Sequence, residues 1–194
     1  MVDNYSIIQP PFTLKFSTMT KQEVKDYCQW YMDQIPIRLE ILFNTIHASR
    51  GFEEWKPDYT PDSLNMLGEW FASQVETREE TQDEIRKMYE DSPDWFKSVE
   101  IETWQLTNRT FSLAFDIGMY VSQVFLKNHE KLKWKFITSG SKRYAEYGQP
   151  VIYPFGKRDF NPTGMMYTQA YGLADETYNG GTLRKTYDIW CKMI

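Results

Sequence analysis

The strongest constraint on the fold is a stretch in the middle of the chain that is apolar around most of a helix. On a helical wheel of residues 109–127, the apolar side chains cover about 240° of the circumference. They are Phe111, Leu113, Ala114, Phe115, Ile117, Met119, Val121, Val124, Phe125 and Leu126. A helix on a protein surface has a much narrower apolar face, so we expect this one to be a central, buried helix.

The remaining narrow stripe of this helix is polar. It contains Arg109, Ser112, Asp116, Tyr120, Gln123 and Lys127. In the simpler interpretation, the stripe opens to solvent or Asp116 pairs with Arg109, two turns earlier. In the alternative, Asp116 and Gln123 line an enclosed polar seam, where an unpaired carboxylate would be costly and therefore functional. No second carboxylate, His or Lys lies at a spacing typical of an acid–base pair.

Further helices are predicted on both sides of the central one. Residues 1–19 look extended, and the capping box from Thr20 to Glu23 begins a helix that Pro36 ends or kinks. A second helical pattern covers 39–46, and Thr60-Pro61 has the form of an N-cap followed by a helix-starting proline. Charged residues 76–94 are predicted to be helical at least to Tyr89. The central helical signal runs from about 101 to 128.

The chain after the central helix changes its pattern. Residues 132–138 alternate as a strand does, and 150–155 are predicted to form a second strand. Phe160-Asn-Pro162 can start a short helix, and 182–193 is predicted to be the last one. Because we find no repeat and no linker, we expect one domain over residues 1–194. The predicted fold class is α+β: mostly helical, with a central buried helix and a small antiparallel sheet.

The composition argues against secretion and membrane insertion. The first residues contain an early Asp and a Pro pair where a signal peptide needs an apolar stretch, and 111–126 is too short and too polar to cross a bilayer. We therefore expect a cytoplasmic protein, with its two cysteines reduced. Cys28 lies on the apolar side of a predicted helix, where it serves as a small core residue.

The sequence contains no recognisable catalytic, metal or cofactor motif. A zinc site needs about three or four protein ligands, and His47 and His129 are far apart and have no nearby Cys. The scattered glycines do not form a phosphate-binding loop. We predict no catalytic residue, no metal and no cofactor.

Charge is distributed unevenly along the chain. Residues 76–94 contain eight acidic and three basic residues, a net charge of −5 that equals that of the whole chain. Residues 127–158 contain eight basic and two acidic residues. The simpler interpretation is that both runs are solvated faces or neutralise each other across the fold.

The functional interpretation is that the acidic run is a docking surface for a basic partner, because clustered like charge steers association. The candidate partner-binding residues are Glu76, Glu79, Glu80, Asp83, Glu84, Glu90 and Asp91. The basic run is interleaved with aromatic residues, as in nucleic-acid-binding surfaces. However, the pI of about 5.2 and the strand alternation, which sends several aromatics inward, argue against nucleic acid.

Part of the chain resembles a known group. The stretches 112–125 (with Asp116-Ile-Gly118), Leu132-Lys-Trp-Lys135, Gln149-Pro-Val-Ile152 and Phe160-Asn-Pro162 resemble small cytoplasmic bacterial proteins of the immunity-protein type from polymorphic toxin systems. The resemblance covers about 50 of the 194 residues. In that group a Glu often stands where Gln123 does here, which argues against a catalytic role at this position. The resemblance implies a binding protein that blocks a toxin and has no chemistry of its own.

Three functions follow as hypotheses. The first is an immunity-type protein that neutralises a cognate toxin through its acidic surface. The second is an enzyme of unrecognised type, with Asp116, Tyr120 and Arg109 in a pocket. The third is a structural or phage-borne accessory protein that forms homo-oligomers. The sequence leaves the oligomeric state open.

Overall fold

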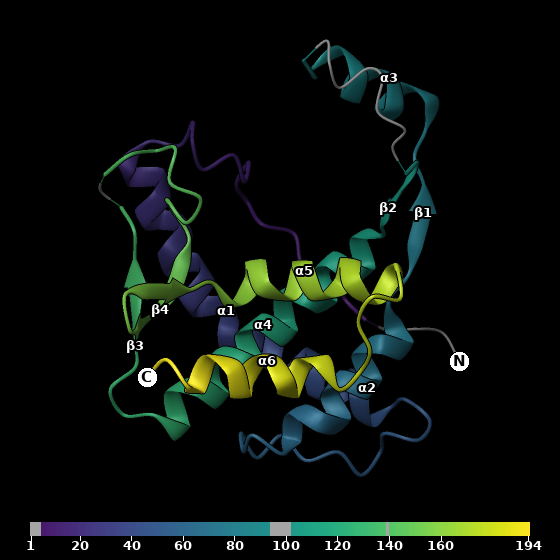
Figure 1. The fold of residues 1–194 in the computed structure, drawn as a ribbon, viewed down its shortest axis with the longest axis vertical. Coiled ribbons are helices and arrows are strands. Elements are labelled where there is room, and N and C mark those ends of the chain that lie inside the picture. The colour runs from purple at the N-terminus through teal and green to yellow at the C-terminus, as the bar shows by residue number, and fades with distance from the viewer. Residues whose placement is uncertain (1–4, 94–101, 139) are drawn as a thin grey trace.

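The computed structural model describes residues 5–93, 102–138 and 140–194 (Figure 1). Its helices are α1 (Lys21–His47), α2 (Ser63–Gln74), α3 (Gln82–Glu90), α4 (Asn108–Asn128), α5 (Pro162–Ala174) and α6 (Thr182–Cys191). Its strands are β1 (Thr77–Glu79), β2 (Trp104–Leu106), β3 (Lys133–Phe136), β4 (Pro150–Phe155) and β5 (Arg158–Phe160). They form a β1–β2 ribbon and a three-stranded antiparallel sheet in the order β3–β4–β5. The predicted α+β class is confirmed.

The predicted central helix is α4, and it is buried along nearly its whole length. It contacts α5 most extensively and also packs on α1 and α2 (Figure 1). A Cβ on Gly118 would lie 3.1 Å from the backbone of Pro162, so the glycine allows the start of α5 to approach closely. The helix begins at Asn108, capped by the Thr107 side chain, and not near 101 as predicted. Trp104–Leu106 instead pair with β1.

Helix α1 is longer than its sequence predicts. The capping box at Thr20 is confirmed, but the helix continues through Pro36 to His47 and absorbs the predicted second helix. Proline removes one backbone hydrogen bond. Buried Ile35 and Leu39, on either side of it, hold both halves of the helix against the core. The predicted cap at Thr60 is wrong, because its hydroxyl bonds Asp58 and α2 begins at Ser63.

The two predicted strands after α4 are confirmed as β3 and β4, which pair from Lys133↔Tyr153 to Phe136↔Pro150. The sequence pattern did not reveal β5, which follows a tight turn at Gly156 and Lys157. Helix α5 follows, capped by Asn161, and is 13 residues long rather than short. Cys28 is buried, as expected, and its thiol lies 3.9 Å from the carbonyl oxygen of Gly148. Cys28 and Cys191 are both free thiols.

The acidic run forms a projection that we call the arm (residues 76–93 and 102–106). Residues 77–79 are a strand, so the predicted helix over the start of this run is wrong, and α3 carries the rest. In Figure 1 the β1–β2 ribbon holds α3 away from the other helices. We call these other helices, together with the β3–β4–β5 sheet, the body. No residue of α3 is buried. The arm therefore contributes little to the core.

Candidate functional site

Asp116 is buried, and its partner is a residue that the sequence analysis overlooked. The carboxylate accepts hydrogen bonds from Nε (2.8 Å) and Nη2 (2.8 Å) of Arg38, one to each oxygen. The Tyr5 hydroxyl donates a third to Oδ2 at 2.5 Å. Both predicted forms of the simpler interpretation, an open stripe and a pair with Arg109, are wrong. The seam around Asp116 is enclosed, as the alternative supposed, but its carboxylate is paired.

Arg38 lies on the buried face of α1, three residues after Ile35 and four before Leu42. A lone arginine at the apolar spacing of a helix is the signal that could have revealed the pair. Burial raises the pKa of Asp116 to about 6, against the opposing hydrogen bonds and charge of Arg38. The carboxylate of Asp116 and the guanidinium of Arg38 bond each other and the hydroxyls of Tyr5 and Ser112. A buried ion pair requires such additional hydrogen bonds.

The N-terminal segment (residues 5–20) closes over this ion pair. Besides its bond to Asp116, the Tyr5 hydroxyl accepts a hydrogen bond from Nη2 of Arg38 at 2.9 Å. The backbone N–H of Ile8 donates to Oγ of Ser112 at 2.8 Å. Asp116 lines neither of the hollows beside this segment in the described part of the chain. The condition for the enzyme hypothesis, a pocket that reaches Asp116, is therefore not met there.

The rest of the polar stripe is divided among separate contacts. Arg109 donates to the side chain of Gln74 at 2.8 Å. The Tyr120 ring is buried, and its hydroxyl bonds Ser63 at 2.8 Å. Gln123 is half-buried, and its amide lies 3.3 Å from the hydroxyl of Ser122. Arg109 also lies over the Tyr5 ring, 5.8 Å from its centroid, and so stands beside the Asp116 cluster. Tyr120 and Gln123 have their partners elsewhere, so the structure does not bring the whole stripe together into one site.

A second polar cluster, which the sequence did not reveal, joins the ends of α4 and α6. Nε2 of His129 lies 3.0 Å from the Tyr187 hydroxyl and 3.3 Å from Sγ of Cys191. Burial raises the pKa of the Cys191 thiol and lowers that of His129. Both helices present their C-terminal ends here, where the helix dipole disfavours a thiolate. The arrangement is that of a neutral imidazole of His129 beside a neutral thiol of Cys191 and the hydroxyl of Tyr187.

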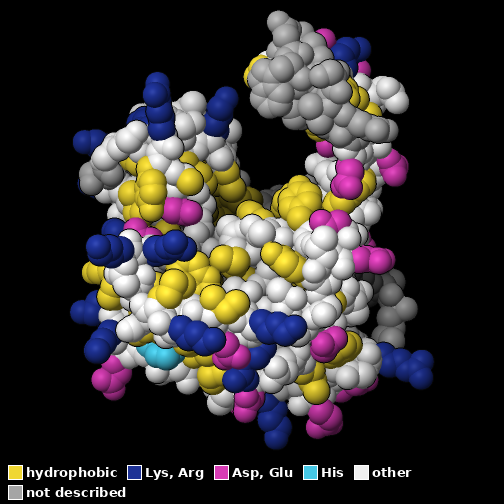
Figure 2. All heavy atoms as spheres, viewed as in Figure 1, with side chains coloured by type: hydrophobic (Ala, Val, Ile, Leu, Met, Phe, Trp, Pro, Cys, Tyr) yellow, Lys and Arg dark blue, Asp and Glu magenta, His cyan; other side chains and the backbone are white. Residues whose placement is uncertain are grey.

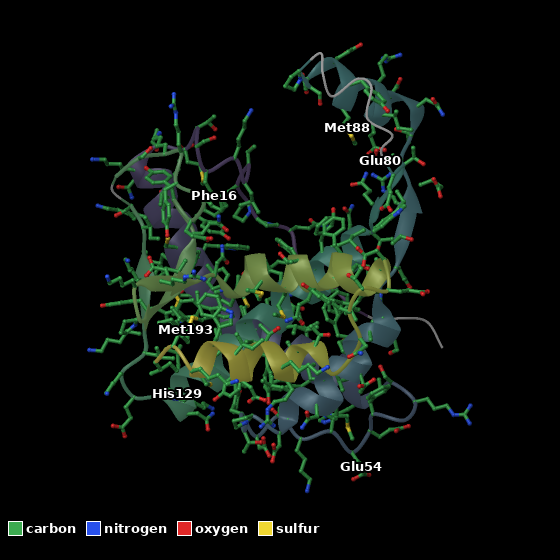
Figure 3. The ribbon with its side chains drawn as sticks, in the orientation of Figure 1. Phe16, Glu54, Glu80, Met88, His129 and Met193 are labelled. Carbon is green, nitrogen blue, oxygen red and sulfur yellow. The ribbon has the colours of Figure 1, made fainter. Side chains whose placement is uncertain are left out.

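The candidate partner-binding residues lie together on the arm. Glu76, Glu79, Asp83, Glu90 and Asp91 are exposed, whereas Glu80 and Glu84 are half-buried. Figure 3 places Glu80 and Met88 on the arm, across from Phe16 of the N-terminal segment. Oε2 of Glu80 is buried, and no described residue donates a hydrogen bond to it. Asp94, the last acid of the run, lies outside the described residues.

Glu84 has a structural role in the arm. Its carboxylate accepts hydrogen bonds from Nη1 and Nη2 of Arg78 (3.0 and 2.6 Å) and from the backbone N–H of Thr81 (2.8 Å). Together with Thr81 it forms the capping box that begins α3. These bonds, those from Arg78 foremost, hold the pKa of Glu84 far below its ordinary value of 4.5. The ionised form of Glu84 is therefore the one that supports α3.

Acidification is expected to loosen α3 before the rest of the protein. A carboxylate with a lowered pKa contributes its full stability above the ordinary pKa and loses it as the pH falls through the folded value. The amide protection of α3 should decrease below the ordinary pKa of 4.5, while that of α6 persists. Hydrogen exchange measured by NMR from neutral pH to about pH 2 checks this. Glu84→Gln should give weak, pH-independent protection of α3, and an unchanged pH profile in this variant would contradict the assignment.

The basic run does not neutralise the arm. Lys135 pairs with Asp159 at 2.8 Å, and the ammonium of Lys127 lies over the Tyr59 ring. Among the described residues, no ion pair connects the arm with residues 127–158. In that part of the chain the proposed neutralisation across the fold is therefore wrong. The acidic charge of the arm faces solvent.

No protein family, curated protein or solved structure matches this chain. The site must therefore be interpreted from its own geometry. Over the described ranges, no helix is both long enough and apolar enough to cross a membrane. Within the same ranges, no three His, Cys, Asp or Glu side chains come together as metal ligands would.

Proposed function

We propose that this chain is an immunity-type binding protein that captures a cognate bacterial toxin through the arm. One observation carries the proposal: α3 is a helix without a single buried residue, it is held away from the body, and its acids Asp83 and Glu90 are exposed. The proposal places the protein in the cytoplasm and needs no chemistry of its own, in line with the resemblance to immunity proteins.

The local interactions of α3 support a binding role. Short helices are marginally stable unless an apolar face packs on a core. Helix α3 instead depends on its capping box and on the pair between Arg78 and Glu84. Its apolar residues Ile85, Met88 and Tyr89 are only half-buried, and they share one face at helical spacing. An amphipathic helix of this kind can gain further stability from a bound partner.

The charge of the arm predicts the partner's surface. Acidic side chains attract a basic patch over distances of about one Debye length, roughly 10 Å at 0.1 M salt. Such steering acts mainly on the association rate. The toxin domain should therefore present lysines or arginines to the arm.

The test is a pair of charge-matched variants, assayed against the toxin domain that the proposal expects to be encoded beside this chain in its own genome. The arm variant combines Glu76→Gln, Glu79→Gln and Glu90→Gln, none of which caps α3. The control combines Glu40→Gln, Glu54→Gln and Glu130→Gln, which are equally exposed and lie outside the arm. Glu54 lies at the opposite end of the molecule (Figure 3).

The arm variant is expected to associate about tenfold more slowly at low salt, with a shallower salt dependence and a smaller change in dissociation rate. Surface plasmon resonance at several salt concentrations measures all three quantities. Protection of toxin-expressing cells should decrease in parallel. Equal effects of the two variants would mean that only net charge matters, and the arm would then not be the binding surface.

A further inference from the structure

A hollow of about 360 Å³ lies between the N-terminal segment and α4. Its apolar lining comes from Ile7, Leu14, Phe111, Phe115 and Tyr167, among others. Ile7 is 42% exposed and Leu14 is 41% exposed, and both side chains line this hollow. Figure 2 shows hydrophobic side chains gathered where the surface is hollowed between the arm and the body.

A row of aromatic rings connects this hollow with the arm. The Phe111 ring lies 5.4 Å from that of Tyr167 and 6.2 Å from that of Tyr171, both in edge-to-face geometry. Tyr171 in turn lies 6.0 Å from Trp104 in β2. Trp104 is the register partner of Glu79, one of the exposed acids. The row therefore runs from an apolar hollow to the acidic surface.

The polar groups of the hollow do not favour a small metabolite. The Ser112 hydroxyl is already bonded to Ile8 and Tyr5. In the described part of the chain, the other polar groups of its lining are the exposed side chains of Gln9 and Asn108 and the hydroxyl of Tyr167. Small-molecule sites have volumes of roughly 300–1,000 Å³, a range that includes this hollow, but their polar groups converge on the ligand and are free to bond it. The mostly apolar lining of this hollow is better suited to a large apolar side chain of a protein.

We propose that the hollow receives an aromatic or branched aliphatic side chain of the toxin. Lysines or arginines on either side of that residue bind the acids of the arm. This inference rests on the proposed function and adds the partner's recognition element. The charge of the arm selects a basic sequence, and the aromatic row selects an apolar residue within it. Large apolar side chains seated in pockets dominate the affinity of many interfaces.

The test uses synthetic peptides as probes of the full chain. The first peptide carries one Phe between two Lys-rich flanks, the second replaces Phe with Ala, and the third replaces the Lys residues with Glu. Binding is followed by NMR chemical shifts. The first peptide should shift signals of Ile7, Phe111 and Tyr167 together with those of α3. The second should shift α3 alone, and the third should shift neither.

Leu14→Trp should fill the hollow and weaken binding of the Phe peptide at least about tenfold, without changing that of the Ala peptide. Ile7→Trp is a second variant at the same hollow, in case the first perturbs folding. Ile189→Trp is the matched control, because Ile189 is 57% exposed on α6 and does not line the hollow.

The outcomes separate the two proposals. If Leu14→Trp, Ile7→Trp and Ile189→Trp bind the Phe peptide equally well, the inference about the hollow is wrong. Sensitivity to the three arm substitutions would in that case still support the proposed function. If neither the hollow nor the arm responds to any peptide or to the toxin, both are wrong. Light scattering measures whether the chain forms a dimer. If it does, and if Leu14→Trp dissociates that dimer, a second copy of the chain fills the hollow and the inference is wrong.

Discussion

Asp116→Ala is expected to lower the free energy of unfolding by about 3–5 kcal/mol, because it leaves the buried guanidinium of Arg38 without its counter-charge. Arg38 and Asp116 are 4% and 0% exposed in their side chains, so water cannot replace the lost carboxylate. The substitution also removes one hydrogen-bond acceptor of the Tyr5 hydroxyl. Urea unfolding above pH 7 measures the effect, since the Asp116 pKa of about 6 ensures that the carboxylate is ionised.

The control for Asp116→Ala is a double variant, Arg38→Met with Asp116→Leu. Replacing both members of a buried ion pair by apolar residues of similar volume is often neutral or stabilising, whereas removing one member alone is strongly destabilising. The double variant should therefore unfold within about 1–2 kcal/mol of the wild type. A single variant as stable as the double one would show that the ion pair is not essential to the fold.

Gly68→Ala is expected to destabilise the protein by about 2–3 kcal/mol, although alanine favours a helix. A Cβ on Gly68 would lie 2.1 Å from the carbonyl oxygen of Gly180 and 3.1 Å from Cβ of Leu183. The first of these atoms is backbone, so α2 and α6 must separate to make room. Thermal unfolding measures the change.

Met66→Ala is the matched control for Gly68→Ala in the same helix. Met66 is 40% exposed, and a surface change of this kind should alter stability by about 0.5 kcal/mol or less. If Gly68→Ala lowered the stability no more than Met66→Ala does, α2 and α6 could separate at little cost and the prediction would be wrong.

Patterns that depend on neighbouring residues in the chain were predicted well. The apolar wheel of residues 109–127 located α4, because a helix that is apolar around most of its surface has to be buried. The capping box at Thr20 located the start of α1, since both of its hydrogen bonds are local. Alternation over residues 132–138 located β3, and the strand predicted at 150–155 is β4.

Features that depend on distant residues were missed. The partner of Asp116 is Arg38, 78 positions away along the chain, and no local spacing reveals it. Trp104–Leu106 have no strand signal of their own beyond their pairing with Thr77–Glu79. Pro36 predicted an end or a kink in α1, and the helix does not end there, because packing on both sides of it outweighed one lost hydrogen bond. The acidic surface was visible as a run of charge, whereas the hollow beside it depends on the fold.

The root of the arm is narrow. The backbone N–H of Thr107 donates to the carbonyl of Glu76 at 3.0 Å, and the N–H of Glu76 donates to Oγ1 of Thr110 at 2.9 Å. The chain thus leaves and rejoins the helices at neighbouring points, and β2 adds a contact of Trp104 with Tyr171 of α5. We expect changes of sequence in α3, beyond the β1–β2 ribbon, to leave α2 and α4 in place. Such a protein can acquire a new recognition element by exchanging the arm alone. Selection for folding continues to act on the body.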